Sequence, residues 1–435
     1  MTRQQSPVSP PVVLTVAGSD SGGGAGIQAD LKTIEAGGAF GTSVITSVTA
    51  QNTTGVADSH LLPVDQIEAQ LTAVLDDFDV AAVKTGMLAA EPVIDLLVEY
   101  ADRLPNLVVD PVMVATSGDR LLDPAAEDAY ERLLTEATLV TPNADEAAVL
   151  TGVDPETPAD LRAAGEELRE MGVDAALVKG GHVPGDSVVD VLVTEDGIER
   201  FEHPRVDTEA THGSGCTLSS AIATRLASGD TLGRAVESGV DLLARAVRYN
   251  LDVGEGPGAV HHMVETRDRA ASEPTAEAVE AVVASLVEAD VSPLVDEAGM
   301  AVVGATPYAE DDGDIAAVEG RIARTREGLR SNRGVRFAAG GRVADLLLDA
   351  REIRPSLAFA CRCRHDPPVA DALDSMDWET VSLGRGVDID HVRDIFAERE
   401  PTALLDRRRD STVVFARDTA TLRDRVLGLA AAVDD

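Results

Sequence analysis

The sequence is poor in positive charge, and in lysine above all. Its 37 basic residues stand against 76 acidic ones, giving a net charge of −39 at pH 7, and the only lysines are Lys32, Lys84 and Lys179. This charge argues against nucleic acid as a partner, because binding its phosphates depends on clustered Lys and Arg. Together with only 3% aromatic residues, the acidity is typical of halophilic organisms. We expect the protein to loosen in dilute buffer, where its self-repulsion is not screened.

Cysteine and long apolar runs are also scarce. Three cysteines cannot form a disulfide framework and suit a reducing compartment. No apolar run reaches 18 residues, and residues 1–11 lack the apolar stretch of a signal peptide. We therefore expect a cytoplasmic protein with no membrane partner. A length of 435 residues predicts two domains, and the 44% hydrophobic content argues against a disordered acidic chain.

Short apolar runs alternate with helical patterns through the first 250 residues. The runs that predict strands are 12–17, 43–50, 80–83, 107–109, 138–140 and 175–178. Segments 187–194 and 198–203 flank an Asp-Gly pair and predict a β-hairpin. The alternation predicts a mostly parallel sheet with helices on both faces. Ligands of such sheets bind at the carboxyl edge of the strands.

Two glycine-rich stretches, 18–26 and 211–217, stand directly before segments with a helical pattern. The stretch 18–26 lets backbone approach a ligand closely. At 211–217, the first backbone N–H groups of the helix can converge on a phosphate or an oxyanion, and the helix dipole adds positive potential. Cys216 lies at the second helix start, where this field stabilises a thiolate that could accept a proton. The alternative is a plain connection before a core helix, with Cys216 as a small buried hydrophobic residue.

Two polar residues near the first strands are candidates for substrate binding. Asp30, in the first turn of the helix expected over 27–35, could accept a hydrogen bond from a substrate hydroxyl, or it could be a favourable helix-start charge. Gln51 follows the strand 43–50 and carries both a donor and an acceptor. It could recognise a heteroaromatic ring with an amino group beside a ring nitrogen, or it could be an ordinary turn residue.

Oxygen ligands and a lysine follow the later strands. Asp110, Asn143 and Glu146 fall at the carboxyl edge, where they could hold Mg²⁺, partly through water. Asp145 and Glu146 could equally be favourable charges at a helix N-terminus. Lys179, one of only three lysines, ends another strand, which favours pairing with phosphate over solvation.

Nine segments together carry a family resemblance: 18–20, 22–33, 50–53, 84–87, 110–113, 141–143, 179–182, 211–216 and 258–262. They resemble the hydroxymethylpyrimidine/phosphomethylpyrimidine kinases of thiamine biosynthesis, over a domain of residues 12–262. The resemblance implies a ribokinase-like three-layer α/β fold with a mostly parallel central sheet. It also implies that ATP and Mg²⁺ serve two successive phosphorylations, first of the hydroxymethyl oxygen and then of the monophosphate.

The resemblance also implies roles for particular residues. These are pyrimidine binding by Gly18, Asp30, Gln51 and Met87, an anion hole formed by Gly213, Ser214, Gly215 and Cys216, contacts near the ATP phosphates by Asp110 and Lys179, and organisation of hydrated Mg²⁺ by Asn143 and Glu146. Cys216 occupies the place where sugar kinases of the superfamily carry an aspartate base. The alternatives are a pyridoxal-type vitamin kinase of the same fold and a non-catalytic sensor of the thiamine pathway.

The remainder of the chain predicts a second, smaller α/β domain. Residues 263–275 are polar and are expected to be a linker, and residues 276–435 resemble a thiamine-phosphate synthase domain through 314–322 and 335–337. Residues 338–342 and 406–410 depart from the Gly-Ala-Ser-Ser-His and Gly-Lys-Glu-Pro elements of that family. We therefore expect a degenerate domain that binds thiamine phosphate or a related ligand, with a bifunctional enzyme as the alternative. The protein is expected to be a homo-oligomer.

Residues 361–365, Cys-Arg-Cys-Arg-His, suggest a metal site at first sight. On a strand, however, Cys361 and Cys363 share one face with Phe359, while Arg362 and Arg364 share the other. No second Cys/His pair completes four ligands. We expect core cysteines, with the arginines as candidate phosphate contacts.

Overall fold

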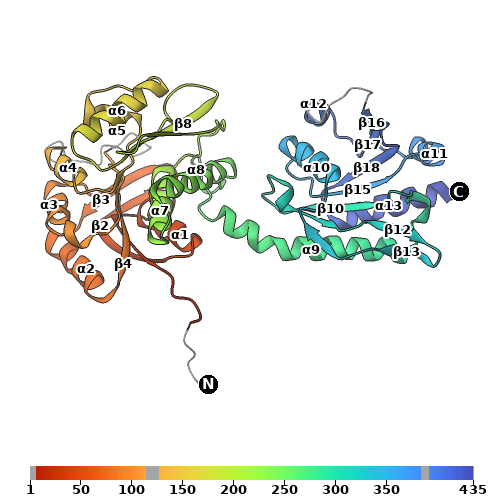
Figure 1. The fold of residues 1–435 in the computed structure, drawn as a ribbon, viewed down its shortest axis with the longest axis horizontal. Coiled ribbons are helices and arrows are strands. Elements are labelled where there is room, and N and C mark those ends of the chain that lie inside the picture. The colour runs from red at the N-terminus through yellow and green to blue at the C-terminus, as the bar shows by residue number, and fades with distance from the viewer. Residues whose placement is uncertain (1–5, 114–126, 384–390, 435) are drawn as a thin grey trace, which may run out of the picture. The chain divides into compact units, whose positions relative to one another are not determined.

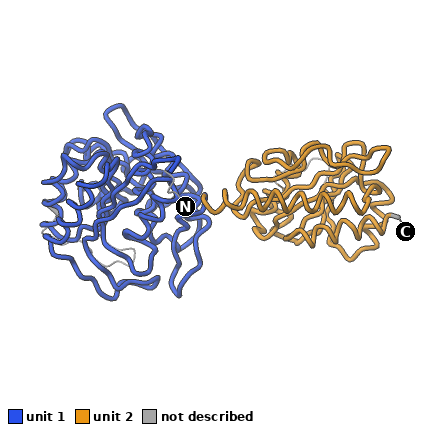
Figure 2. Tube along the Cα trace, turned by 90° about the horizontal axis from the view of Figure 1, so that it is seen from below, with its two compact units in different colours: residues 1–265 blue, residues 266–435 orange. Residues whose placement is uncertain are grey.

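The computed structural model describes residues 6–113, 127–383 and 391–434. Figures 1 and 2 show that the chain forms two compact units, residues 1–265 and residues 266–435. In the described ranges, every helix is too short or too polar to span a membrane.

The first unit is built on a nine-stranded sheet (Figure 1). Its strands are β1 (Val12–Asp20), β2 (Phe40–Asn52), β3 (Gly55–Leu61), β4 (Val80–Thr85), β5 (Leu107–Val109), β6 (Leu139–Val140), β7 (Ala176–Val178), β8 (Ser187–Val193) and β9 (Ile198–Pro204). Their spatial order is β3-β2-β1-β4-β5-β6-β7-β8-β9. All neighbours from β2 to β7 pair in parallel, and β3, β8 and β9 pair antiparallel. The predicted mostly parallel sheet and the β8–β9 hairpin are confirmed.

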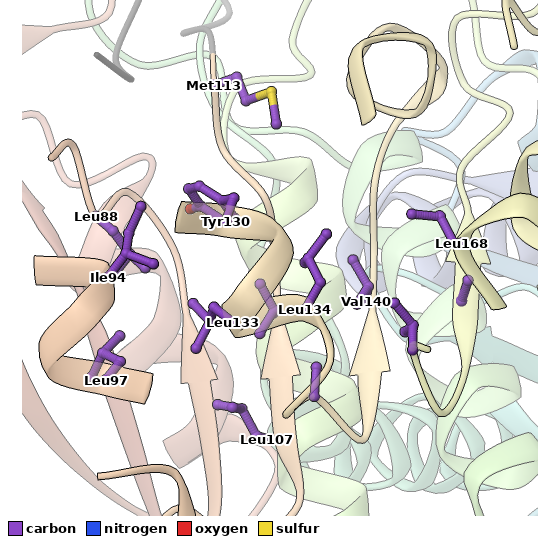
Figure 3. Packing of buried hydrophobic residues seen from close by; sticks show 14 of the residues in the cluster. Leu88, Ile94, Leu97, Leu107, Met113, Tyr130, Leu133, Leu134, Val140 and Leu168 are labelled. Atoms are coloured by element: carbon purple, nitrogen blue, oxygen red, sulfur yellow. The ribbon is translucent and has the colours of Figure 1, made fainter. Parts of the chain in front are cut away.

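Helices cover both faces of this sheet. They are α1 (Gly26–Ala36), α2 (Val64–Asp77), α3 (Glu91–Glu99), α4 (Glu127–Leu134), α5 (Ala144–Thr151), α6 (Pro158–Glu170), α7 (Ser214–Ala227) and α8 (Leu232–Arg248). One buried cluster packs strand residues against α2 to α6, and a second packs them against α1, α7 and α8. Figure 3 shows part of the first cluster, with Leu133 and Leu134 of α4 near Leu107 and Val140 of the strands.

Alternation along the strands explains why both faces are buried. Leu107 and Val109 of β5 belong to the first cluster, whereas Val108 between them belongs to the second. Successive side chains of a strand point to opposite faces, so an uninterrupted apolar strand requires cover on both sides. The polar ends of these strands therefore emerge together at one edge.

The edge strand β3 was not expected from the sequence. Gln51 and Asn52 still belong to β2, and after a tight turn the chain returns along it from Gly55 to Leu61. Most side chains of β3 are exposed. An exposed edge strand carries no continuous apolar run, so hydrophobic patterning could not reveal it.

The second unit contains a seven-stranded sheet and a separate hairpin. The sheet order is β14-β11-β10-β15-β18-β17-β16, antiparallel except for the β16–β17 pair. Its elements are β10 (Ala301–Ala305), β11 (Ile315–Val318), β14 (Val335–Phe337), α10 (Arg342–Ile353), β15 (Phe359–Arg364), α11 (Pro367–Ser375), β16 (Thr380–Leu383), α12 (His391–Glu398), β17 (Ala403–Asp406), β18 (Ser411–Ala416) and α13 (Thr419–Asp434), with the hairpin β12 (Ile322–Thr325) and β13 (Gly328–Ser331). An α/β unit is thus observed where the sequence predicts one.

The segment 263–275, expected to be a linker, is helical from Val264 onward. It forms one helix, α9 (Val264–Glu288), with the segment that follows, and Pro274 lies inside it. Its Glu, Arg and Ala residues favour a helix even though they are polar or small. The polarity of this segment therefore did not indicate an irregular connection.

Cys361 and Cys363 are buried in the core of the second unit, as predicted. Both belong to the same apolar cluster as Phe359. Arg362, on the other face of β15, donates to both carboxylate oxygens of Asp296 and to the backbone oxygen of Gly299. Its guanidinium is thus held within the fold, which argues against the expected role as a phosphate contact.

Candidate active site

A cavity of about 730 Å³ opens at the carboxyl edge of the parallel strands in the first unit. Its size is that of a small-ligand site. The predicted site residues that line it are Gly18, Gln51, Met87, Asp110, Asn143, Glu146, Lys179, Gly213, Ser214, Gly215 and Cys216. They come from the ends of β1, β2, β4, β5, β6 and β7 and from the start of α7. The fold thus brings together residues that are up to 198 positions apart in the sequence.

The close approach of Gly18 and Met87 shapes one wall of the cavity. A Cβ atom added at Gly18 would lie 2.6 Å from Met87 Cε and 2.7 Å from Ser47 Oγ. Any side chain at this position would therefore require the methyl end of Met87 to move. The strand register also shifts between Ala17 and Ser19, which marks Gly18 as an irregular point of β1.

The glycine turn, residues 211–217, begins helix α7. Gly213 has φ of +83° at the cap position, and a Cβ atom there would lie 1.9 Å from the backbone oxygen of Gly24. Only glycine fits this backbone and this contact. The N–H groups of Gly215 and Cys216 fall in the first turn of α7, where an α-helix offers no acceptor. They are available to an anionic ligand.

Lys179 and Asp110 lie against the glycine turn. A Cβ atom added at Gly215 would lie 3.2 Å from Lys179 Nζ and 3.3 Å from Asp110 Oδ2. Lys179 Nζ donates to Asp110 Oδ1 over 3.0 Å, and Thr141 Oγ1 donates to the same oxygen over 3.2 Å. Although burial lowers the pKa of Lys179, the charges of Asp110 and Glu146 raise it above its usual value. A permanent cation therefore stands beside the free N–H groups.

Cys216 differs from the expectation of a stabilised thiolate. Burial raises the pKa of its thiol to about 11, and the negative charges of Asp30 and Asp110 act in the same direction. Lys84 and a backbone hydrogen bond from Gly26 lower the pKa, but by less. The helix field is thus outweighed by desolvation. Cys216 is therefore a neutral thiol at pH 7, which corrects the expectation of a thiolate.

Asp30 does not line the cavity, contrary to the expectation that it binds substrate. Helix α1 starts at Gly26, so Asp30 lies beyond its first turn on the inward face, and its exposed fraction is 0%. Lys84 Nζ donates to its two oxygens over 2.8 and 3.0 Å. The hydroxyls of Thr15 and Ser220 donate over 2.6 and 2.8 Å. Asp30 instead holds Lys84, whose side chain reaches the cavity wall.

Asn143 and Glu146 form a capping box at the start of α5. Asn143 Oδ1 accepts from the Glu146 N–H, and Glu146 Oε2 accepts from the Asn143 N–H, each over 2.8 Å. Burial and the nearby charge of Asp110 together raise the pKa of Glu146 to about 7, against the lowering effect of Lys179. A divalent cation would relieve this repulsion. Asp110 and Glu146 offer two carboxylates in the cavity wall, and such a donor set fits Mg²⁺, which binds one or two carboxylates together with water and substrate phosphate.

Three residues that sequence reasoning did not assign belong to the site. Lys84 ends β4 just as Lys179 follows β7, and the scarcity of lysine was the signal that could have identified it. Asp20 accepts from the N–H groups of Gly22, Gly24 and Ala25 and so shapes the loop before α1; no signal in the sequence separates it from other loop aspartates. His212 lies in the glycine turn with its Nε2 atom 3.3 Å from Asp20 Oδ2.

Comparison with protein families divides the chain into two matched regions. Residues 20–261 match the family described as phosphomethylpyrimidine kinase, and residues 278–425 match the family described as thiamine-phosphate synthase ThiN. A hydroxymethylpyrimidine/phosphomethylpyrimidine kinase of Streptomyces coelicolor is 48% identical over 266 residues, covering 60% of this chain and 98% of that protein. The thiamine biosynthesis bifunctional protein ThiED of Geobacter sulfurreducens is 46% identical over 261 residues, covering 59% of this chain and 53% of that protein.

Solved structures confirm the expected ribokinase-like fold of the first unit. The ADP complex of Bacillus subtilis pyridoxal kinase has a TM-score of 0.56 at 33% identity, covering 59% of this chain and 99% of that one. Staphylococcus aureus pyridoxal kinase in complex with AMP-PCP and pyridoxal has a TM-score of 0.56 at 30% identity, covering 60% and 96%. The chain therefore belongs to the phosphomethylpyrimidine kinase family and carries a second domain of the thiamine-phosphate synthase ThiN family.

Proposed function

We propose that the first unit transfers the γ-phosphoryl group of ATP to 4-amino-5-hydroxymethyl-2-methylpyrimidine and then phosphorylates the monophosphate to the diphosphate. The observation that carries this proposal is the placement of Lys179 and Asp110 against Gly215 of the glycine turn, in a cavity that Gln51 also lines. Phosphoryl transfer depends on positioning and on stabilising charge rather than on covalent chemistry. This cavity offers both.

Each group of residues at the site has its own role in the proposed reaction. Gln51 binds the aminopyrimidine, with Gly18 and Met87 forming the wall beside it. The N–H groups of Gly215 and Cys216, together with Lys179, stabilise the charge on the transferring phosphoryl group. Cys216 stays a thiol at neutral pH because its pKa is about 11, so its contribution as a base is small.

Asp110 and Glu146 would hold Mg²⁺, with Asn143 fixing the position of Glu146 through the capping box. The bound ion would supply charge to the phosphate oxygens of ATP. The raised pKa of Glu146 supports this assignment, because a buried carboxylate close to another is stabilised by a cation.

A second candidate function is phosphorylation of pyridoxal, which the structural likeness to two pyridoxal kinases favours. A competition assay distinguishes phosphorylation of the pyrimidine alcohol from phosphorylation of pyridoxal. The full-length protein is supplied with MgATP and equal concentrations of the pyrimidine alcohol and pyridoxal in molar salt, and both phosphorylated products are quantified. We expect the pyrimidine phosphate to dominate, and a higher kcat/KM for pyridoxal would overturn the proposal.

For the second unit we propose binding of thiamine phosphate or a related phosphorylated ligand without synthase activity. The two segments that depart from the synthase pattern meet in space, since Arg342 Nε donates to Asp406 Oδ2 over 3.0 Å. The side chains of Arg407, Arg408 and Arg409 next to it are exposed. Adding thiazole phosphate to the kinase assay tests the proposal, and formation of thiamine phosphate by the full-length chain would show a bifunctional enzyme instead.

A homo-oligomer acting in the cytoplasm remains part of the proposal, and sedimentation in molar salt tests the assembly.

A further inference from the structure

The Ser21 hydroxyl makes two hydrogen bonds with the backbone of Gln51, in addition to the pairing of β2 with β3. The Gln51 N–H donates to Ser21 Oγ over 2.8 Å, and the Ser21 hydroxyl donates to the Gln51 backbone oxygen over 2.6 Å. Ser21 belongs to the loop that leads into α1. What Gln51 can recognise therefore depends on how its terminal amide is turned.

Two side chains flank that amide. Its Oε1 atom lies 3.2 Å from Thr49 Oγ1, and its Nε2 atom lies 3.3 Å from His212 Nε2. Rotation by 180° about the Cγ–Cδ bond exchanges the oxygen and the nitrogen without moving any other group, because the two atoms occupy equivalent positions. The neighbours must therefore decide which atom stands on which side.

Asp20 fixes the proton on the histidine. His212 Nε2 lies 3.3 Å from Asp20 Oδ2. Burial raises the pKa of Asp20, but hydrogen bonds from His212, Ala25 and Gly22 hold it below its usual value, so Asp20 is a carboxylate. A carboxylate only accepts hydrogen bonds, so a proton on His212 Nε2 is needed for a favourable contact.

The proton on His212 Nε2 determines the orientation of the Gln51 amide. A protonated His212 Nε2 cannot accept from an amide N–H, so the Gln51 atom facing it must be the oxygen. Thr49 leads to the same result, because its single hydroxyl hydrogen is directed at the Ser19 backbone oxygen, 2.9 Å away. Its oxygen is then left to accept, so the Gln51 atom facing it must be the nitrogen. With the amide turned in this way, the single Nε2–H of His212 lies between two acceptors, Asp20 Oδ2 and the Gln51 oxygen, each 3.3 Å from Nε2, and the Gln51 nitrogen donates to Thr49 Oγ1.

We propose that Asp20, His212 and Thr49 are positioning residues that hold the Gln51 amide with its oxygen toward His212 and its nitrogen toward Thr49. An amide has two donor hydrogens and two acceptor lone pairs, of which this arrangement uses one each. One donor and one acceptor remain for the ligand. They complement an amino group beside an unprotonated ring nitrogen and reject a 4-oxo ring with a protonated nitrogen, which presents the reverse order. This inference rests on the proposed function for its substrate.

The first test is independent of activity. The protein is labelled with ¹⁵N-histidine, and the His212 signals are assigned by their loss in His212→Gln. We expect Nε2 of His212 to carry a proton. A tautomer protonated on Nδ1 alone would overturn the inference.

The second test is substrate discrimination, measured as the ratio of kcat/KM for the 4-amino alcohol to that for its 4-oxo analogue. Thr49→Val removes the acceptor on one side, and His212→Leu removes the donor on the other. We expect each to lower the ratio by about tenfold or more, chiefly through KM, because the amide is free to turn. The matched variants Thr49→Ser and His212→Gln retain the needed groups and should keep the ratio within about threefold of the unaltered protein.

The outcomes separate the two proposals. Equal losses for both substrates in Thr49→Val and His212→Leu, with an unchanged ratio, would show a merely structural role and overturn the inference. Failure of the unaltered chain to phosphorylate the amino alcohol would refute the proposed function, while the ¹⁵N spectrum would still decide the protonation of His212.

Discussion

The buried pair of Lys84 and Asp30 makes a quantitative prediction about stability. Both side chains have an exposed fraction of 0%, and their charged atoms are 2.8 Å apart. Lys84→Met removes the cation and leaves Asp30 with the hydroxyls of Thr15 and Ser220 alone. Breaking a buried pair in this way costs about 3–5 kcal/mol. This is a large share of a total stability of roughly 5–15 kcal/mol.

The assay is reversible unfolding by urea in molar salt. The exposed pair of Arg103 and Asp76, at 2.7 Å, is the matched control, and Arg103→Met should cost less than about 1 kcal/mol. Adding Asp30→Asn to Lys84→Met removes the stranded charge, so the double variant should be more stable than the sum of the two single losses allows, by about 2 kcal/mol or more. Strictly additive losses, or a cost for Lys84→Met no larger than that of the control, would refute the reasoning.

Three further predictions concern the site itself. Because the pKa of the Cys216 thiol is about 11, Cys216→Ala should slow the two phosphorylations by similar and small factors in single-turnover assays; a selective loss of the first step, in which an alcohol must lose a proton, would contradict this. Burial raises the pKa of Glu146 from 4.5 to about 7, so without divalent cation the stability it supports is complete below pH 4.5 and falls by about 3 kcal/mol as the pH rises through 7. Glu146→Gln should remove that fall in unfolding experiments from pH 4 to 9, and parallel curves for the two proteins would exclude it. Gly213→Ala should abolish activity and lower the melting temperature more than Gly152→Ala does, since both have positive φ but only Gly213 meets a backbone oxygen, at 1.9 Å; equal shifts would rule out the clash.

The pattern of apolar runs in the sequence predicted which polar residues lie at the ends of the strands. Asp110, Asn143 and Lys179 each follow a short apolar run, and a parallel sheet necessarily brings such residues to one edge. The glycine turn was equally visible, because its glycines stand directly before a segment with a helical pattern. The expectation for Gln51 at the end of β2 also agrees with its place in the cavity wall.

The direction of side chains and the balance of charges could not be predicted in the same way. Asp30 was expected in the first turn of a helix starting at residue 27, whereas α1 starts one residue earlier, and the pairing of Asp30 with Lys84, 54 positions away, could not be read from the local pattern. The raised pKa of Cys216 depends on burial and on Asp110, which is remote in sequence. The contact between His212 and Asp20 joins residues 192 positions apart, and no local rule predicts it.

The second unit shows the same limit. Alternation along 359–364 predicted the buried cysteines, because one strand contains all of the information needed. The bidentate contact of Arg362 with Asp296 spans 66 positions, so the arginine looked free in the sequence. Segment 263–275 was judged by its polarity and by Pro274, whereas its helix-forming residues determined its structure.

The most direct measurement follows the products of the full-length protein with MgATP and 4-amino-5-hydroxymethyl-2-methylpyrimidine in molar salt. The account predicts that the monophosphate forms first and is then converted to the diphosphate, with one ATP consumed at each step. Failure to phosphorylate the pyrimidine under conditions in which the protein is folded, or transfer to pyridoxal alone, would contradict it.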